Sequence, residues 1–148
     1  MERMKAEARF IRAVQYFYLA SYYYDVPLIK TVLTLEEANT VTKSSRAEVL
    51  QYAIDELTEI ADILPHHKDL PASERGRATA QAALVYLART HLIAQNYKEA
   101  AAACKKIIDW GDNKLDPDYQ KLFYPGAINS SEHIYATQFV DDLAGHGL

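Results

Sequence analysis

The sequence has few of the residues that form disulfide frameworks, tight turns or membrane spans. A single cysteine, Cys104, excludes any disulfide within the chain, and its place among alanines predicts a small buried side chain. Only five glycines and five prolines are present, which favours long helices. The longest apolar run, residues 82–88, is far shorter than the roughly 20 residues of a membrane helix. A net charge of −4 without a lysine and arginine cluster argues against a nucleic-acid partner.

The overall composition is that of one globular domain. Of 148 residues, 49% are hydrophobic and 24% are charged, an ordinary balance for a chain that buries a core. We therefore expect residues 1–148 to form a single helical-repeat domain. The sequence starts within a helical pattern and ends at residues 145–148 without a closing element, so we expect a fragment of a longer protein.

Residues 76–111 carry the clearest pattern in the chain. Apolar and small residues recur at spacings of three and four on both sides of a corner at residues 95–97, which predicts two antiparallel helices. Small residues at facing positions let two backbones approach closely, as in tetratricopeptide repeats. His91 and Asp112 stand where this repeat usually has an aromatic residue and a proline, so the copy is degenerate. The expected inner face of the second helix is Tyr97, Ala100, Ala101, Cys104, Ile107 and Ile108.

The whole chain predicts an all-α fold of tetratricopeptide-like antiparallel hairpins. The four main helices are expected near residues 4–24, 45–64, 79–95 and 97–110. Ser45 and Glu48 have the spacing of a capping box, and Thr79 is the expected N-cap of the third helix. Leu87 and Ile107 should be buried between the two central helices.

Three shorter segments complete the predicted fold. Residues 28–44 form a long connection with one expected turn at residues 35–38, and such a loop is a candidate for interactions. Asp116 as an N-cap with Pro117 at the next position predicts one or two turns through Phe123. Residues 134–139 are rich in β-branched and aromatic side chains, which predicts a short C-terminal strand or extended segment.

No local group of titratable residues predicts catalysis, a cofactor or a metal. His66, His67 and Asp69 have the chemistry of metal ligands, but adjacent histidines in a polar linker are usually solvated. His91, on an apolar helix face, is expected to be a hydrogen-bonded core residue. We therefore expect no enzyme, no cofactor and no metal site.

Tyrosine is the abundant residue, with 11 in the chain, and several lie on the first helix. Consecutive helix residues point about 100° apart, so at least one of Tyr22, Tyr23 and Tyr24 should reach the surface. With Asp25 they form the candidate ligand-binding site, because a tyrosine ring can stack on the C–H groups of a sugar. In the alternative interpretation these rings seal the edge of the core.

An ordered set of short motifs runs through nearly the whole chain. The motifs lie at residues 7–13, 16–17, 24–28, 37–39, 45, 49, 57–65, 76–79, 83, 88–89, 96–97, 100, 119, 122–123, 129–132 and 134. Together they resemble the SusD/RagB family of nutrient-binding lipoproteins of the Gram-negative outer membrane. The sequence departs from the family pattern at Tyr23 and Tyr24, where the family usually has Gly or Phe-Gly before the turn at residues 25–28.

The resemblance implies a non-enzymatic cell-surface subunit that binds neutral oligosaccharides for nutrient uptake. It further implies that the helical repeat core contacts a TonB-dependent transporter, while loops contact the ligand. Attachment to the outer membrane would use a lipid anchor whose signal is absent from this chain, and Cys104 cannot supply it because it lies within a predicted helix. The alternative function is a cytoplasmic tetratricopeptide scaffold that binds a peptide in its helical groove. A lipoprotein signal encoded upstream of Met1 would separate the two.

Overall fold

The structure, a computed structural model, describes residues 1–124 and 130–136 and confirms an all-α fold. Within these ranges there is no β-strand, and no helix is long and apolar enough to cross a bilayer. The helices are α1 (Glu2–Tyr23), α2 (Leu35–Thr40), α3 (Arg46–Ala61), α4 (Ala80–Ile93) and α5 (Tyr97–Trp110). Short 3₁₀ turns follow at η1 (His67–Asp69), η2 (Ala72–Glu74) and η3 (Tyr119–Phe123).

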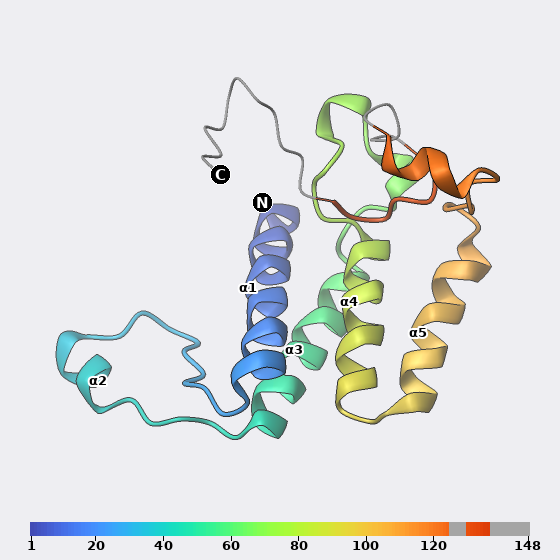
Figure 1. The fold of residues 1–148 in the computed structure, drawn as a ribbon. Coiled ribbons are helices and arrows are strands. Elements are labelled where there is room, and N and C mark those ends of the chain that lie inside the picture. The colour runs from blue at the N-terminus through green and yellow to red at the C-terminus, as the bar shows by residue number, and fades with distance from the viewer. Residues whose placement is uncertain (125–129, 137–148) are drawn as a thin grey trace.

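The four long helices lie side by side in chain order as antiparallel neighbours (Figure 1). α1 packs against α3, α3 packs against α4, and α4 packs against α5. The predicted helical hairpin of residues 79–110 is therefore confirmed, and the first and second long helices form another hairpin beside it.

The helix starts follow the predicted caps. The Glu48 amide donates to Ser45 Oγ, and the Ser45 amide donates to Glu48 Oε2 at 2.8 Å, which completes the capping box of α3. At the start of α4 the Ala82 amide donates to Thr79 Oγ1 at 3.1 Å.

The helix ends depend on individual turns. The last helical residue of α3 is Ala61, earlier than predicted from the pattern up to residue 64. The Ile63 and Leu64 amides both donate to the Ile60 carbonyl, so a tighter turn closes this helix before the next proline. Gly111, with a φ of 65°, ends α5 as predicted.

The corner between α4 and α5 is a Schellman turn built without glycine. Gln95 has a φ of 63°, its amide donates to the Leu92 carbonyl at 3.1 Å, and the Asn96 amide donates to the His91 carbonyl at 2.8 Å. His91 is half-buried and lies 3.4 Å from the Asn96 side-chain amide, as expected for a hydrogen-bonded residue of the core edge. Burial lowers the pKa of the His91 imidazole.

The core lies where α1, α3 and α4 meet. α1 contributes a stripe of small and aromatic residues centred on Phe10, which is 1% exposed. α3 contributes Leu57 and Ile60, and α4 contributes a face rich in alanine with Leu84 and Leu87. Because alanines dominate α4, the helix axes can approach closely, as the small-residue pattern predicted.

The predicted inner face of α5 is partly wrong. The buried residues of α5 are Ala100 and Ala103, with Ile107 half-buried, whereas Tyr97 and Ile108 are 63% and 75% exposed. Cys104, predicted to be buried, is exposed. α5 is the last long helix of the row and packs mainly against α4, so only one narrow stripe of its surface is covered.

The C-terminal elements also differ in detail from the prediction. The N-cap of η3 is Asp118 and not Asp116, because Asp118 Oδ1 accepts from the Gln120 amide at 3.1 Å. Residues 134–136 form no strand, and the remainder of the predicted strand, residues 137–139, lies outside the described residues. Ile134 packs against the core, and Tyr135 contacts Phe10 with ring centroids 5.2 Å apart.

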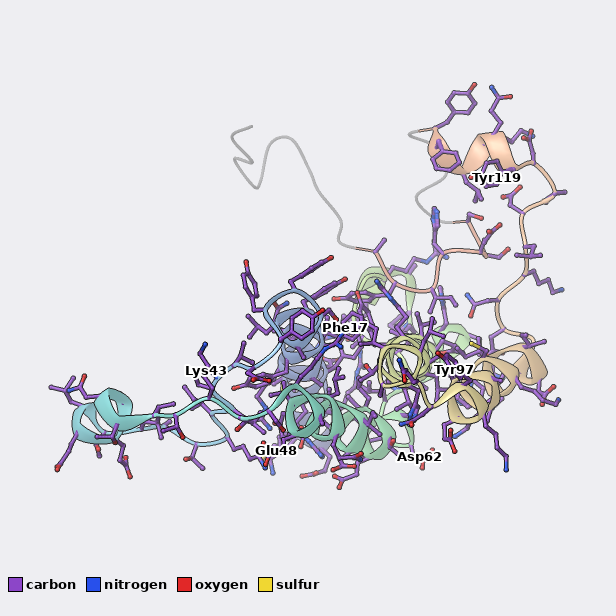
Figure 2. The ribbon with its side chains drawn as sticks, turned by 60° about the horizontal axis from the view of Figure 1, so that its bottom comes forward. Phe17, Lys43, Glu48, Asp62, Tyr97 and Tyr119 are labelled. Carbon is purple, nitrogen blue, oxygen red and sulfur yellow. The ribbon has the colours of Figure 1, made fainter. Side chains whose placement is uncertain are left out.

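The connection between α1 and α3 is an arm that extends from the helix row, with α2 near its tip (Figures 1 and 2). An isolated antiparallel bridge between Val26 and Ser44 closes its base. Tyr16 of α1 fixes the first residues of the arm, because its hydroxyl donates to the Ile29 carbonyl at 3.0 Å and accepts from the Ile29 amide at 2.8 Å. The turn predicted at residues 35–38 is confirmed by α2, which Thr34 caps.

Candidate functional site

The three consecutive tyrosines at the end of α1 are all on the surface. Tyr22, Tyr23 and Tyr24 are 71%, 70% and 61% exposed. The prediction that at least one reaches the surface is confirmed. Residues this exposed cover little of the core, which argues against the alternative interpretation.

Tyr24 has an unusual backbone conformation. Its φ of 62° and ψ of −101° lie where residues with a Cβ are disfavoured. Arg46 stabilises this turn, because its guanidinium carbon lies 4.6 Å from the centroid of the Tyr24 ring and its Nε donates to the Ala20 carbonyl at 3.0 Å. The ring of Tyr24 is thereby fixed at the surface.

Asp25 connects this turn to the next long helix. Its Oδ1 accepts from the Arg46 backbone amide at 2.8 Å, at the start of α3. A carboxylate at this position satisfies an otherwise unpaired helix amide and interacts favourably with the helix dipole. Asp25 therefore has a structural role and is exposed as well.

Tyr22 belongs to a different group of side chains. Its ring is nearly parallel to that of Tyr18, with an interplanar angle of 3° and centroids 6.1 Å apart. The Tyr18 hydroxyl lies 3.1 Å from the Tyr86 hydroxyl. Burial and this hydrogen bond raise the pKa of Tyr86 to about 12, so the Tyr86 hydroxyl stays neutral at physiological pH.

Three of the four predicted site residues thus fall into two groups at one end of α1, while the fourth, Tyr23, is exposed at the same end of the helix. Tyr24 and Asp25 lie with Arg46, and Tyr22 lies with Tyr18. Local sequence gave no signal for Arg46, which is far from Asp25 along the chain. Tyr18 lies one helical turn before Tyr22, so helical spacing could have identified that pair.

His66 of the linker forms a structural contact. His66 Nδ1 lies 3.0 Å from Asp112 Oδ2, and the His66 ring lies 4.2 Å from the Trp110 ring. The contact from His66, and another from Lys68, hold the pKa of the Asp112 carboxyl below its usual range. The described residues contain no group of three or more His, Cys, Asp or Glu side chains suited to a metal ion.

A hollow of about 460 Å³ lies near the opposite end of α1, between the residues that precede α4 and the segment 130–136. Its lining is polar and apolar in about equal measure, and the polar part includes Arg75, Asn113 and His133. Arg77, also in the lining, pairs with Glu7 of α1, which places the hollow about four helical turns from Tyr22. Sequence reasoning did not identify this hollow, because its walls come from segments far apart in the chain.

Comparison with known proteins agrees with the fold. Residues 1–92 match the SusD-like family model described as starch-binding and associating with the outer membrane. The SusD-like protein P25 of Formosa agariphila is 28% identical over 144 residues, 95% of this chain and 26% of that protein. The SusD-like protein P2 of the same organism is 31% identical over 150 residues, 96% of this chain and 28% of that protein. The chain thus spans about a quarter of the length of these curated relatives.

Solved structures give the same result. A SusD-like carbohydrate-binding protein of Bacteroides fragilis is 48% identical, with a TM-score of 0.91 over 95% of this chain and 28% of that chain. A laminarin-binding SusD-like protein is 26% identical, with a TM-score of 0.77 over 82% of this chain and 27% of that chain. The family match over more than half of the sequence, together with the shared fold, shows that this chain belongs to the SusD-like family.

Proposed function

We propose that this chain is part of a non-enzymatic glycan-binding subunit at the surface of the outer membrane. The observation that carries the proposal is the row of exposed rings at Tyr22, Tyr23 and Tyr24 on a SusD-like helical scaffold. The laminarin-binding relative supports a glycan as the ligand. The family description supports the location at the outer membrane.

The chemistry of this end of α1 suits a sugar. A pyranose presents apolar C–H groups on its faces and hydroxyls at its edges, so it pairs with a ring face and a nearby polar group. Tyr24 is oriented by Arg46, and the Asp25 oxygen that does not cap α3 can accept a hydroxyl hydrogen bond. Such a site binds its ligand without bond cleavage.

Calorimetric titration against a panel of plant and host glycans tests the proposal. Tyr22→Ala, Tyr23→Ala and Tyr24→Ala are compared with Tyr97→Ala, a tyrosine of similar exposure on α5 (Figure 2). At least one of the first three should weaken binding about tenfold without lowering the melting temperature, while the control binds normally. If every loss of affinity is matched by a loss of stability, these tyrosines are structural and the proposed site is wrong.

The partner in this proposal is a TonB-dependent transporter that takes the glycan inward. The arm between α1 and α3 supports a protein contact, because Val32 and Leu35 near its tip are 100% and 81% exposed. Co-purification with the co-expressed transporter, with Val32→Glu and Leu35→Glu as variants, measures this contact. Retention of the transporter by both variants would contradict a role for the arm. Binding of a peptide in the helical groove, in place of a glycan, would favour the tetratricopeptide scaffold.

A further inference from the structure

Arg89 of α4 is surrounded by aromatic rings. Its guanidinium carbon lies 5.1 Å from the Phe17 ring centroid, 5.3 Å from that of Tyr86 and 6.0 Å from that of Tyr18. The arginines of α1, and Arg77 in the segment before α4, pair with glutamates. Arg89 differs from them, because no carboxylate of residues 1–124 or 130–136 lies within ion-pair distance of its guanidinium. The rings hold the guanidinium in place and leave its hydrogen-bond donors available for a ligand.

A second hollow, of about 310 Å³, opens beside this guanidinium. Its walls include Tyr86 and Arg89 from α4, and Glu132 and Tyr135 from the segment 130–136. The volume is at the lower end of the range for small-molecule sites. Aromatic walls with a few polar groups are the composition expected of a site for one sugar unit.

The hollow and the exposed Tyr22 are parts of one surface. Tyr18 lies between them, because its ring is parallel to that of Tyr22 at 6.1 Å and also lies beneath the Arg89 guanidinium. A ligand that stacks on the open face of Tyr22 and continues past Tyr18 therefore reaches Arg89 and then the hollow. This path is too long for a single sugar ring and fits a short oligosaccharide.

We propose that Arg89 binds the carboxylate of an acidic sugar, so that the ligand of this surface is an oligosaccharide containing uronic acid units. A guanidinium offers a planar pair of donors that matches both oxygens of a carboxylate. Because the rings already restrict Arg89, little side-chain freedom is lost on binding. The inference rests on the proposed glycan-binding function and replaces its expected neutral ligand with an acidic one.

Glu132 determines where the acidic unit lies. Its Oε2 accepts from the Asp116 amide at 2.7 Å, which fixes this carboxylate in the wall of the hollow. A second anion inside the hollow would be repelled by it. The carboxylate that Arg89 binds therefore lies on the Tyr18 side of the guanidinium, and a sugar unit in the hollow directs its own carboxylate away from Glu132.

Calorimetry of the chain with oligogalacturonides, laminari-oligosaccharides of equal length and oligoglutamate tests this proposal. The oligogalacturonide should bind about tenfold more tightly than the neutral sugar, and this preference should shrink as sodium chloride is raised. Arg89→Gln should remove the preference, and Arg89→Lys should retain part of it because it keeps the charge without the planar fork. Arg75→Gln, in the wall of the other hollow, is the matched control and should bind normally.

The outcomes separate this inference from the proposed function. Neutral sugar bound as tightly as oligogalacturonide overturns the inference and leaves the glycan-binding function standing. Oligogalacturonide binding that survives Arg89→Gln, or that oligoglutamate equals, also overturns it, since charge alone would then explain the result. Failure to bind any glycan overturns both. Melting curves of Arg89→Lys and Arg89→Gln show whether each variant is folded, and the salt dependence of the unaltered chain needs no variant.

Discussion

At the scale of single residues, Tyr24 is a position where the residue type does not suit the backbone conformation. Its φ of 62° is one that glycine adopts freely and that a residue with a Cβ adopts at a free-energy cost. The family that the sequence resembles usually has a glycine before this turn, and this chain has a tyrosine. The cost is partly offset by the contact with Arg46, and the result is an aromatic ring held at the surface.

We predict that Tyr24→Gly is more stable than Tyr24→Ala by about 1–2 kcal/mol. Both variants lose the ring and its contact with Arg46, so their difference isolates the backbone cost of the positive φ. Urea unfolding followed by circular dichroism measures it. At Tyr23, the last helical residue of α1, the same two substitutions should give the opposite order, because glycine is the weaker helix former. Equal stability of the two Tyr24 variants would show that the positive φ at this position carries no free-energy cost.

Part of the candidate site could be read from the sequence. Helical geometry alone predicted that at least one of Tyr22, Tyr23 and Tyr24 is exposed, since three consecutive residues cannot share one buried face. That all three are exposed is seen only in the structure. The partners Arg46 and Arg89 could not be predicted, because they reach this end of α1 only through packing between helices. Such long-range contacts leave no pattern in a local window.

At the scale of elements, the helices themselves were predictable because their signals are local. The capping box at Ser45, the cap at Thr79 and the glycine after α5 fixed the boundaries within a few residues. The facing of α5 was not predictable, because its sequence carries two apolar stripes. Only the surface of α4 decides which stripe is buried, and the alanine-rich stripe fits closely against it.

The corrected facing predicts unequal effects for two large apolar residues. Leu87→Ala should lower the free energy of unfolding by about 2–5 kcal/mol, because this side chain is 7% exposed and its removal leaves a cavity. Ile108→Ala should lower it by less than about 0.5 kcal/mol, because Ile108 is 75% exposed. Thermal and urea melts give both values. Similar losses of stability from the two variants would mean that Ile108 is buried against α4, as the sequence pattern predicted.

An ion-pair network joins α1 to α3. Arg9 Nε lies 2.9 Å from Glu56 Oε2, and Arg12 Nη2 lies 3.2 Å from the same oxygen, while the Glu56 side chain is 14% exposed. Burial raises the pKa of the Glu56 carboxyl, but the hydrogen bonds from the two arginines outweigh it and the net pKa is lowered. Because the pKa of Glu56 is lower in the folded state than its ordinary value of 4.5, the ionised carboxylate stabilises the fold at pH values above 4.5.

We predict that Glu56→Gln lowers the free energy of unfolding by about 1–3 kcal/mol at pH 7. The difference from the unaltered chain should shrink as the pH falls from about 4.5 through the lower pKa of the folded state, because Glu56 is then protonated. Glu59→Gln is the control, since Glu59 pairs with the same Arg9 but is 67% exposed, and should cost less than about 0.5 kcal/mol. A pH-independent difference for Glu56→Gln would show that the charge is not the cause.

At the scale of the whole molecule, the helix row exposes an apolar stripe on the outer side of its last helix. Tyr97 and Ile108 are 63% and 75% exposed, and Cys104 and Ala101 lie between them at helical spacing. In the part of the chain that the structure describes, no element covers this face of α5. Water-exposed apolar surface of this kind favours association, because burying it releases ordered water.

We therefore predict that the chain self-associates as its concentration rises. Sedimentation velocity in the presence of a reductant, which prevents disulfides through Cys104, should show an average mass that increases with concentration. The double variant Tyr97→Lys with Ile108→Lys should shift association to higher concentration, because hydrated charges oppose burial of the stripe. Glu99→Gln with Ala102→Lys adds the same net charge at exposed positions of α5 and should associate like the unaltered chain. A constant monomer mass at all concentrations would show that the exposed stripe of α5 does not cause association. Equal association of the two double variants would show that the contact between copies lies outside this stripe.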